Sequence, residues 1–391
     1  MIGHKSIRKF LFSLPNIGRG IGAMAFNAVL FFILNKTGDH ELLYNYSWIL
    51  VLTSLFVTFT GWGLRDYFVK EYIKNTPDSP TLFSEIVSGK AVLLGLSALL
   101  ICFTGWTWTF KIFLIALVAV RTLLAVYDPL ILLKGKTLHL FIFESFLYTS
   151  TIILFVFFLP LRGMAVQALL LCEAFRALAA ILLVRDTGLV RVSLRSALRL
   201  LYETKFYFAI ALFSLFMSRG DVYIMGTYHK NSFAYYSIIL NLVSVSQIII
   251  SSVYNNTIKA VFRLASNKAQ AALDKLMLQF IILSVLSVSC IIGFAIFIYH
   301  IPLDYSFSGL LLVSMFFYCI TVKQLFILNH LNKLNYFLIA AILAALVNVV
   351  FSILLVPSYQ MHGAMVANVS GTIALVTTIK FLLVRNKAIL A

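Results

Sequence analysis

The sequence has little charge and very little acid. Of its 391 residues, 12% are charged, and 14 aspartates and glutamates stand against 31 lysines and arginines. A soluble domain carries about twice that share of charged residues, which it needs to cover its surface. With 61% hydrophobic residues, the chain suits lipid rather than water as its solvent.

Clusters that bind metals, form disulfides or hold nucleotides are also lacking. The seven histidines show neither metal spacing nor a His-Asp pair for acyl transfer. The pairs Gly89-Lys90 and Gly135-Lys136 lack the other residues of a phosphate-binding loop. We expect no catalysis, no cofactor and no metal. The four cysteines lie apart in apolar runs and indicate no disulfide framework: Cys102, Cys172, Cys290 and Cys319.

Apolar runs of about twenty residues recur along the whole chain. Each is long enough to cross the hydrocarbon core as a helix that satisfies its own backbone hydrogen bonds. We therefore predict an all-α membrane protein with about twelve transmembrane helices. The expected spans are residues 10–34, 42–63, 82–104, 108–130, 138–159, 164–184, 205–227, 233–256, 276–299, 306–328, 336–356 and 363–384.

Basic residues are distributed unevenly between the two sides of these spans. One side holds about twenty lysines and arginines, whereas the other holds only Lys36, Arg162 and Lys230. The positive-inside rule makes the rich side cytoplasmic and places both termini there. The same asymmetry explains most of the net charge of +17, so membrane lipids rather than nucleic acid are the expected partners.

The longest cytoplasmic connection divides the chain into two sets of six spans. Between Arg185 and Glu203, three arginines four residues apart adjoin a leucine face, as in an amphipathic interfacial helix. We predict an N-terminal lobe over 1–184, a linker helix over 185–204 and a C-terminal lobe over 205–391.

Four arginines lie deep inside the predicted spans: Arg19, Arg121, Arg176 and Arg219. Each costs about 3 kcal/mol if it faces lipid, so we expect all four to face protein or water. Arg176 can pair with Glu173, three residues earlier on the same helix. For Arg121, a partner on another helix or a ligand must be supplied. Arg219 and Asp221 point to different sides of a regular helix.

Two stripes of polar side chains follow two of the spans. The first contains Asn16, Arg19, Ala23 and Asn27, close to the Gly18–Gly22 spacing of a packing motif. The second contains Asn241, Ser244, Gln247 and Ser251. Either stripe can make hydrogen bonds between helices or line a hydrated cavity, and both alternatives stay open.

Four short motifs occur at the ends or beginnings of predicted spans. They are Gly61-Trp62-Gly63-Leu64 with Arg65 and Glu71, Asp221-Val222-Tyr223-Ile224-Met225-Gly226, Ala234-Tyr235-Tyr236-Ser237 and His362-Gly363-Ala364-Met365-Val366-Ala367. These motifs resemble those of the polysaccharide flippases of the O-antigen translocase type, a family within the multidrug, oligosaccharidyl-lipid and polysaccharide exporter superfamily. The sequence departs from that family in two places: the glycine usual before Tyr-Ser is missing, as is the proline usual after the eighth span.

The resemblance implies two lobes around a central cavity that opens alternately to each side of a bacterial inner membrane. The implied cargo is a polyprenyl-diphosphate-linked oligosaccharide, with a glycan polymerase and glycosyltransferases as partners. Its diphosphate needs cations, for which Arg19 and Arg219 come first and Arg121 third. Candidates to bind its sugars are Asn27, Asn241, Gln247 and Ser251.

Transport without ATP hydrolysis needs a supply of cargo or an ion gradient. The membrane acids that could bind a proton or sodium are Asp221, Glu144 and Glu173. Two other functions stay open: a drug or metabolite antiporter of the same fold, and a multispanning glycan polymerase or acyltransferase. The cationic residues at depth favour an anionic cargo over a cationic drug.

Overall fold

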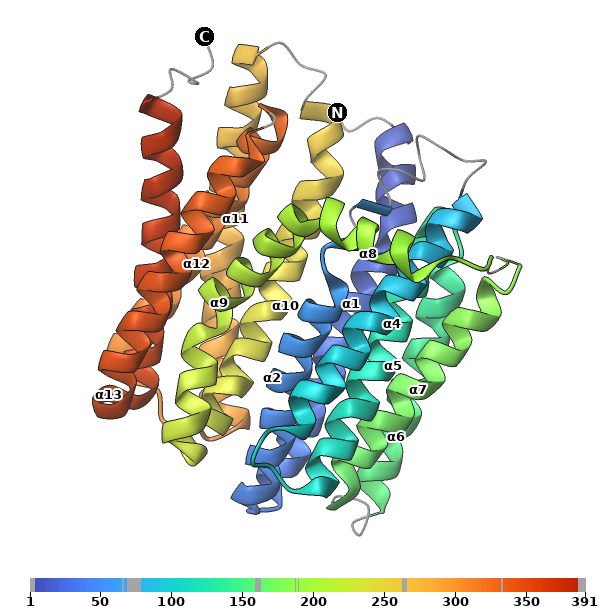
Figure 1. Cartoon of the computed structure of the whole chain (residues 1–391). Helices are drawn as coiled ribbons and strands as arrows, with labels where there is room; N and C mark the ends of the chain where they lie inside the picture. The colour runs from blue at the N-terminus through green and yellow to red at the C-terminus, as the bar shows by residue number, and fades with distance from the viewer. Residues whose placement is uncertain are drawn as a thin grey trace. The chain divides into compact units, whose positions relative to one another are not determined.

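The computed structural model describes residues 4–64, 67–68, 79–158, 163–186, 188, 190–261, 266–331 and 333–385 (Figure 1). Every regular element within these residues is a helix. The helices are α1 (His4–Lys36), α2 (His40–Gly61), α4 (Ser79–Cys102), α5 (Trp108–Leu133), α6 (Thr137–Phe157), α7 (Ala165–Leu183), α8 (Leu194–Glu203), α9 (Lys205–Tyr228), α10 (Lys230–Val261), α11 (Ser266–Gly293), the π-helix η3 (Phe294–Ile298), α12 (Tyr305–His330) and α13 (Leu334–Arg385).

The described helices confirm an all-α membrane fold with about twelve crossings. Eleven are long and apolar enough to span a bilayer. The last of them, α13, has 52 residues and a non-helical backbone at Gln360, so it consists of two spans. Large apolar side chains are exposed along the spans, including Phe146 at 72% and Leu354 at 66%. Such a surface requires lipid around it.

The helices pack as two compact units. One unit contains residues 1–44 and 213–391, in which α1 packs along α10 and α12 packs between α11 and α13. The other contains residues 45–212, in which α5 packs on α4 and α7, and α6 packs on α7. The unit boundaries fall inside α2 and α9. The lobes at 1–184 and 205–391 stay a prediction, since packing units are not by themselves the bodies that move.

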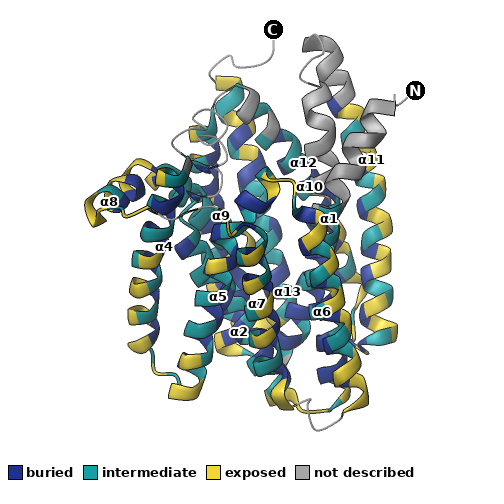
Figure 2. Cartoon of the chain, turned by 90° about the vertical axis from the view of Figure 1, so that its right-hand side faces the viewer, coloured by how far each residue is buried: buried dark blue, intermediate teal, exposed yellow. Residues whose placement is uncertain are grey.

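The linker contains a helix shorter than predicted. It begins at Leu194 because Ser193 acts as the N-cap, its side chain accepting a hydrogen bond from the Ser196 N–H at 3.2 Å. Arg191 therefore precedes the helix, which corrects the expectation of three arginines on one helical face. Figure 2 shows buried and exposed positions alternating along α8, as an amphipathic helix requires.

The segment after α2 turns sharply and is clamped to the start of α9. Trp62 and Gly63 both have positive φ values, 47° and 66°. The indole of Trp62 stacks on Phe208 with 3.8 Å between ring centroids and donates to the Leu201 carbonyl at 2.9 Å. A Cβ at Gly63 would lie 2.5 Å from Cβ of Tyr207, so only glycine fits. Arg65 and Glu71 of this motif lie outside the described residues.

A second turn, at Gln360, separates the two halves of α13. The Gln360 side chain accepts a hydrogen bond from Ser232 at 2.6 Å, and His229 contacts the Pro357 carbonyl at 3.1 Å. A Cβ at Gly363 would lie 2.4 Å from the Leu355 carbonyl oxygen. The His362-Gly363 motif therefore marks a position where the backbone folds back on itself.

Candidate functional site

A chain of four alternating charges links α5, α6 and α7. Arg176 donates from Nε and Nη2 to Oε1 of Glu144 at 3.0 and 2.9 Å, and from Nη1 to Oε2 of Glu173. Arg121 donates from Nε to Oε1 of Glu173 at 3.0 Å, and its Nη2 forms an ion pair with the same oxygen at 2.9 Å. Tyr148 lies under Arg176, with 5.5 Å from the guanidinium carbon to the ring centroid. The four charges balance, as burial requires.

The Arg121 end of this chain of charges is more exposed than the other three members. Glu144 and Glu173 are 1% and 6% exposed, whereas the Arg121 side chain is 22% exposed. The predicted Arg176–Glu173 pair is confirmed. Arg121, for which no local partner was expected, is paired with Glu173 from a neighbouring helix. Of the three acids proposed for ion coupling, Glu144 and Glu173 are thus paired with arginines, which leaves Asp221 as the acid to consider.

In the other unit, α9 and α10 are joined by two polar contacts. The phenol of Tyr236 donates to Oδ2 of Asp221, and Arg219 Nη2 donates to the Ser244 hydroxyl at 2.9 Å. Asp221 is fully buried, and its Oδ1 has no hydrogen-bond partner among the described residues. Arg219 likewise has no described carboxylate within 4.0 Å. This pair of ionisable groups is therefore less completely satisfied than the four charges on α5, α6 and α7.

The polar stripe on α10 makes hydrogen bonds between helices. Asn241 donates to the Met24 carbonyl on α1 at 3.1 Å, and Ser244 accepts from Arg219 on α9. The Gln247 carbonyl accepts from Tyr318 on α12 at 3.2 Å, while the Ser251 hydroxyl bonds to its own helix. Gln247 and Asn27 lie in the same unit, and both residues are partly exposed. The hydrogen bonds between helices explain why Asn241 and Ser244 are polar.

Arg19 lies on α1, which packs along α10. Its side chain is buried, at 8% exposure. The helices are close at the next residue, since a Cβ at Gly20 would lie 3.3 Å from Cγ2 of Ile248. The backbone of α1 beside Arg19 therefore lies close to α10. The side chain of Asn16, the first member of the predicted stripe, lies outside the described residues.

Comparisons with known proteins identify solved structures that have a similar fold. No protein-family model and no curated protein matches the sequence. The structure is similar to lipid II flippase MurJ in an inward closed conformation, with a TM-score of 0.67 and 16% identity over 96% of this chain and 87% of that one. It is also similar to the eukaryotic MATE transporter AtDTX14, with a TM-score of 0.60 and 12% identity over 97% and 96% of the two chains.

A third similar structure is a MOP-superfamily transporter from Pyrococcus furiosus, with a TM-score of 0.54 and 14% identity over 98% of this chain and 96% of that one. The chain has the MOP-superfamily transporter fold. At these identities the likeness concerns the fold alone, and the site residues must be judged from their own contacts.

Within this MOP-type fold, α13 carries a polar cluster that was not predicted from the sequence. Asn348 is fully buried, donates to the Met217 carbonyl at 2.6 Å and accepts from Ser352 at 3.0 Å. A Cβ at Gly220 would lie 3.4 Å from the amide oxygen of Asn348. Asn348 thus packs against the segment between Arg219 and Asp221. The spacing of Asn348 and Ser352 in an apolar span could have revealed them as one helical face.

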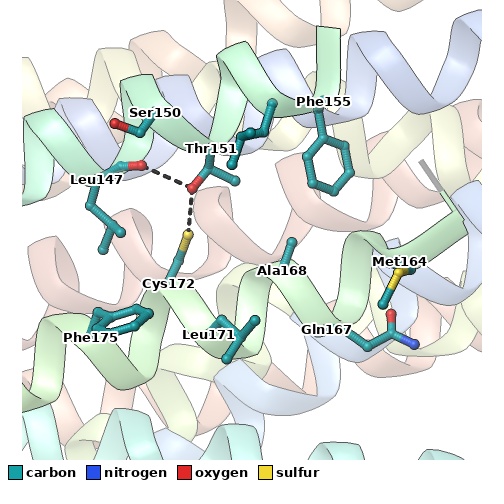
Figure 3. A pocket seen from close by; sticks show the side chains of 11 residues that line it. Leu147, Ser150, Thr151, Phe155, Met164, Gln167, Ala168, Leu171, Cys172 and Phe175 are labelled. Carbon is teal, nitrogen blue, oxygen red and sulfur yellow. Dashed lines mark hydrogen bonds between the residues drawn. The ribbon is translucent and has the colours of Figure 1, made fainter. Parts of the chain in front are cut away.

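An apolar crevice lies between α6 and α7 in the other unit of the MOP-type fold. Figure 3 shows Leu147, Phe155, Leu171 and Phe175 around it. The Thr151 hydroxyl and the Cys172 thiol form a hydrogen bond with 3.0 Å between Oγ1 and Sγ. The volume of the crevice is about 310 Å³. None of the predicted cargo residues lines it, and an apolar lining does not suit a diphosphate. Among the described residues, no group of three metal-binding side chains occurs.

Proposed function

We propose that this chain is a transporter that flips a polyprenyl-diphosphate-linked oligosaccharide from the cytoplasmic to the outer leaflet of a bacterial inner membrane. It would do so by alternating access between two lobes, and it would not be an enzyme. The MOP-type fold supports a transporter. The anionic cargo is supported by the arginines at depth.

One observation carries the proposal on cargo. Arg219 lies inside a membrane span, and its described hydrogen bond goes to a hydroxyl, not to a carboxylate. A guanidinium in that position favours an anionic group, which a diphosphate provides in bidentate form. Arg176, by contrast, is saturated by Glu144 and Glu173. The two arginines therefore make a matched pair for an experiment.

Arg19 and Arg121 complete the proposed cation set, and Asn27, Gln247 and Ser251 are the proposed sugar contacts. Asn241 stays a candidate although its amide bonds to α1. For coupling we propose Asp221, whose buried Oδ1 is free to take a proton or a cation. Glycosyltransferases that build the cargo, and a polymerase that consumes it, are the proposed partners.

Transport of a cationic drug is the second candidate function. The buried Asp221 with an unpartnered oxygen favours it. The nearby Arg219 opposes it, because a like charge repels a cationic ligand. The two candidates therefore differ in what the loss of Arg219 would do.

The experiment measures flipping of a fluorescent polyprenyl-diphosphate glycan in proteoliposomes containing the purified full chain. Arg19→Ala and Arg219→Ala should each reduce flipping at least tenfold with normal protein yield, and the matching lysine variants should keep partial activity. Arg176→Ala is the control and should lower protein yield instead. Wild-type flipping in both alanine variants would refute the cargo, and gain of cation export in Arg219→Ala would favour the antiporter.

A further inference from the structure

The short helix α8 presents a stripe of apolar side chains that none of the described residues covers. Leu194, Leu198 and Tyr202 are 61%, 49% and 69% exposed. They are spaced four residues apart, so they lie within about 80° of arc on the helix surface. This stripe is separate from the face that α8 buries against its neighbours.

That buried face fixes α8 to α4. Ala197, Leu200 and Leu201 are buried, and a Cβ at Gly89 would lie 3.4 Å from Cδ2 of Leu201. Leu200 and Leu201 belong to an apolar core with Phe83 and Ile86 of α4. The helix that carries the apolar stripe is therefore held in place against α4.

Cations border the stripe on its outer side. Arg195 is exposed and makes no hydrogen bond or ion pair with the described part of the chain. Lys205, the first residue of α9, places its ammonium 3.8 Å from the centroid of the Tyr202 ring. Arg199 is different, because it is paired with Glu203 at 2.8 Å and also interacts with the charge of Glu85. Arg195 and Lys205 are thus the cations available to a ligand.

The position of α8 in the chain puts this surface at the edge of the bilayer. The span α7 ends at Leu183, and the span α9 begins at Lys205 directly after α8. Between them, the Val190 N–H donates to the Ser84 hydroxyl near the start of α4 at 2.9 Å. The stripe is therefore anchored to span ends, at the level where hydrocarbon meets lipid headgroups.

We propose that α8 is a docking surface for anionic phospholipid of the adjoining leaflet. Leu194, Leu198 and Tyr202 enter the boundary of the hydrocarbon, while Arg195 and Lys205 contact lipid phosphate. Apolar side chains beside unpaired cations match an anionic bilayer surface in both polarity and charge. The inference is independent of the cargo and adds a dependence of this transporter fold on lipid composition.

The test uses the full chain in nanodiscs that contain a photoreactive phosphatidylglycerol or a photoreactive phosphatidylcholine. Cross-links to the 190–206 segment are counted by mass spectrometry. The anionic lipid should label this segment at least fivefold more than the zwitterionic one, and the excess should fall with added salt. Arg195→Gln and Lys205→Gln should each reduce the excess at least twofold, because the two cations share it.

Arg199→Gln/Glu203→Gln is the matched control, since it removes one positive and one negative charge of an ion pair and leaves the net charge of α8 unchanged, and it should change the excess less than twofold. Equal labelling by the two lipids would overturn the proposal, because it would mean an interfacial helix without charge recognition. Absence of labelling by both lipids would also overturn it, since another protein or a second copy would then cover the stripe.

Discussion

Arg121 on α5 and Glu173 on α7 form an ion pair with 2.9 Å between Nη2 and Oε1. The same carboxylate pairs with Arg176 through its other oxygen, so one acid lies between two guanidinium groups. Glu144 then closes the other side of Arg176. Charge balance in this unit therefore depends on Glu173 more than on any other member of the four.

We predict that Glu173→Gln destabilises the protein strongly, because it leaves an uncompensated cation among buried groups. Removing one partner of a buried pair costs about 3 to 5 kcal/mol. The midpoint of thermal unfolding in detergent should fall, and the double variant Arg121→Gln/Glu173→Gln should recover part of the loss. A single variant as stable as the wild type would mean that water solvates the charge of Arg121.

The contacts of Glu173 show which ion pairs could be predicted from the sequence and which could not. The Arg176–Glu173 contact was predictable because a spacing of three residues places both on one helix face. The Arg121 contact was not, since its partner is 52 residues away on another helix. Hydropathy predicted the spans, including the break in α13, because a bilayer demands about twenty apolar residues per crossing.

The candidate site was predictable only as a list of residue types. Polar residues in apolar spans revealed Arg219, Asp221 and Asn241, but not their partners. Tyr236 and Asn348 were missed as site residues because one phenol or amide in a span is not costly enough to attract notice. Their contacts depend on which helices pack together, and hydrophobic periodicity does not encode that choice.

A comparison of alanine substitutions at Gly63 and Gly135 separates the cost of backbone strain from that of a steric clash. Both have left-handed backbones, with φ of 66° and 69°. A Cβ at Gly135 meets no atom within 4 Å, whereas one at Gly63 meets Cβ of Tyr207 at 2.5 Å. Gly135→Ala should therefore cost about 1 to 2 kcal/mol, the strain alone. Gly63→Ala should cost clearly more.

Thermal unfolding of the two purified alanine variants checks this difference. Phe208→Ala, which removes the stacking partner of Trp62, tests whether the clamp itself matters and should lower the midpoint as well. Equal effects of Gly63→Ala and Gly135→Ala would contradict the tight approach to α9.

Membrane orientation can be tested at two positions of opposite predicted location. Lys230 is expected outside the cell, and Arg195 inside, because of the charge asymmetry of the loops. In a variant lacking the four native cysteines, an impermeant maleimide should label Lys230→Cys in intact cells. It should label Arg195→Cys only after permeabilisation. The reverse pattern would invert the orientation.

The loop before α12 contains an acid that should make stability depend on pH. Asp304 accepts a hydrogen bond from the Phe307 N–H at 2.8 Å and one from His362 at 2.9 Å, and these contacts hold its pKa below the usual range. A lowered pKa stabilises the fold above the unfolded value of about 3.9, and the contribution is lost as pH falls through the folded value. The gap in stability between wild type and Asp304→Ala should shrink as pH falls below the unfolded value and vanish in stronger acid. A gap that does not change down to pH 2 would exclude the carboxylate as its source.

The contact between α1 and α10 yields the last prediction. At Gly20 a Cβ would lie 3.3 Å from Cγ2 of Ile248, so alanine fits after a small shift, but leucine forces the helices apart. Overpacking of this kind costs about 1 to 3 kcal/mol. Gly95 on α4 meets no atom within 4 Å of its Cβ position, so Gly95→Leu is a matched control that adds the same bulk without a clash. We expect Gly20→Leu to lower the unfolding midpoint and, because Arg19 is the preceding residue, to reduce flipping as well.

The double variant Gly20→Leu/Ile248→Ala should restore the unfolding midpoint, because the smaller side chain at position 248 makes room for the leucine. If the double variant is stable but still fails to flip the glycan, the position of Arg19 depends on the helix contact itself. If Gly20→Leu and Gly95→Leu are equally stable and equally active, α1 and α10 do not pack as tightly as the structure has them.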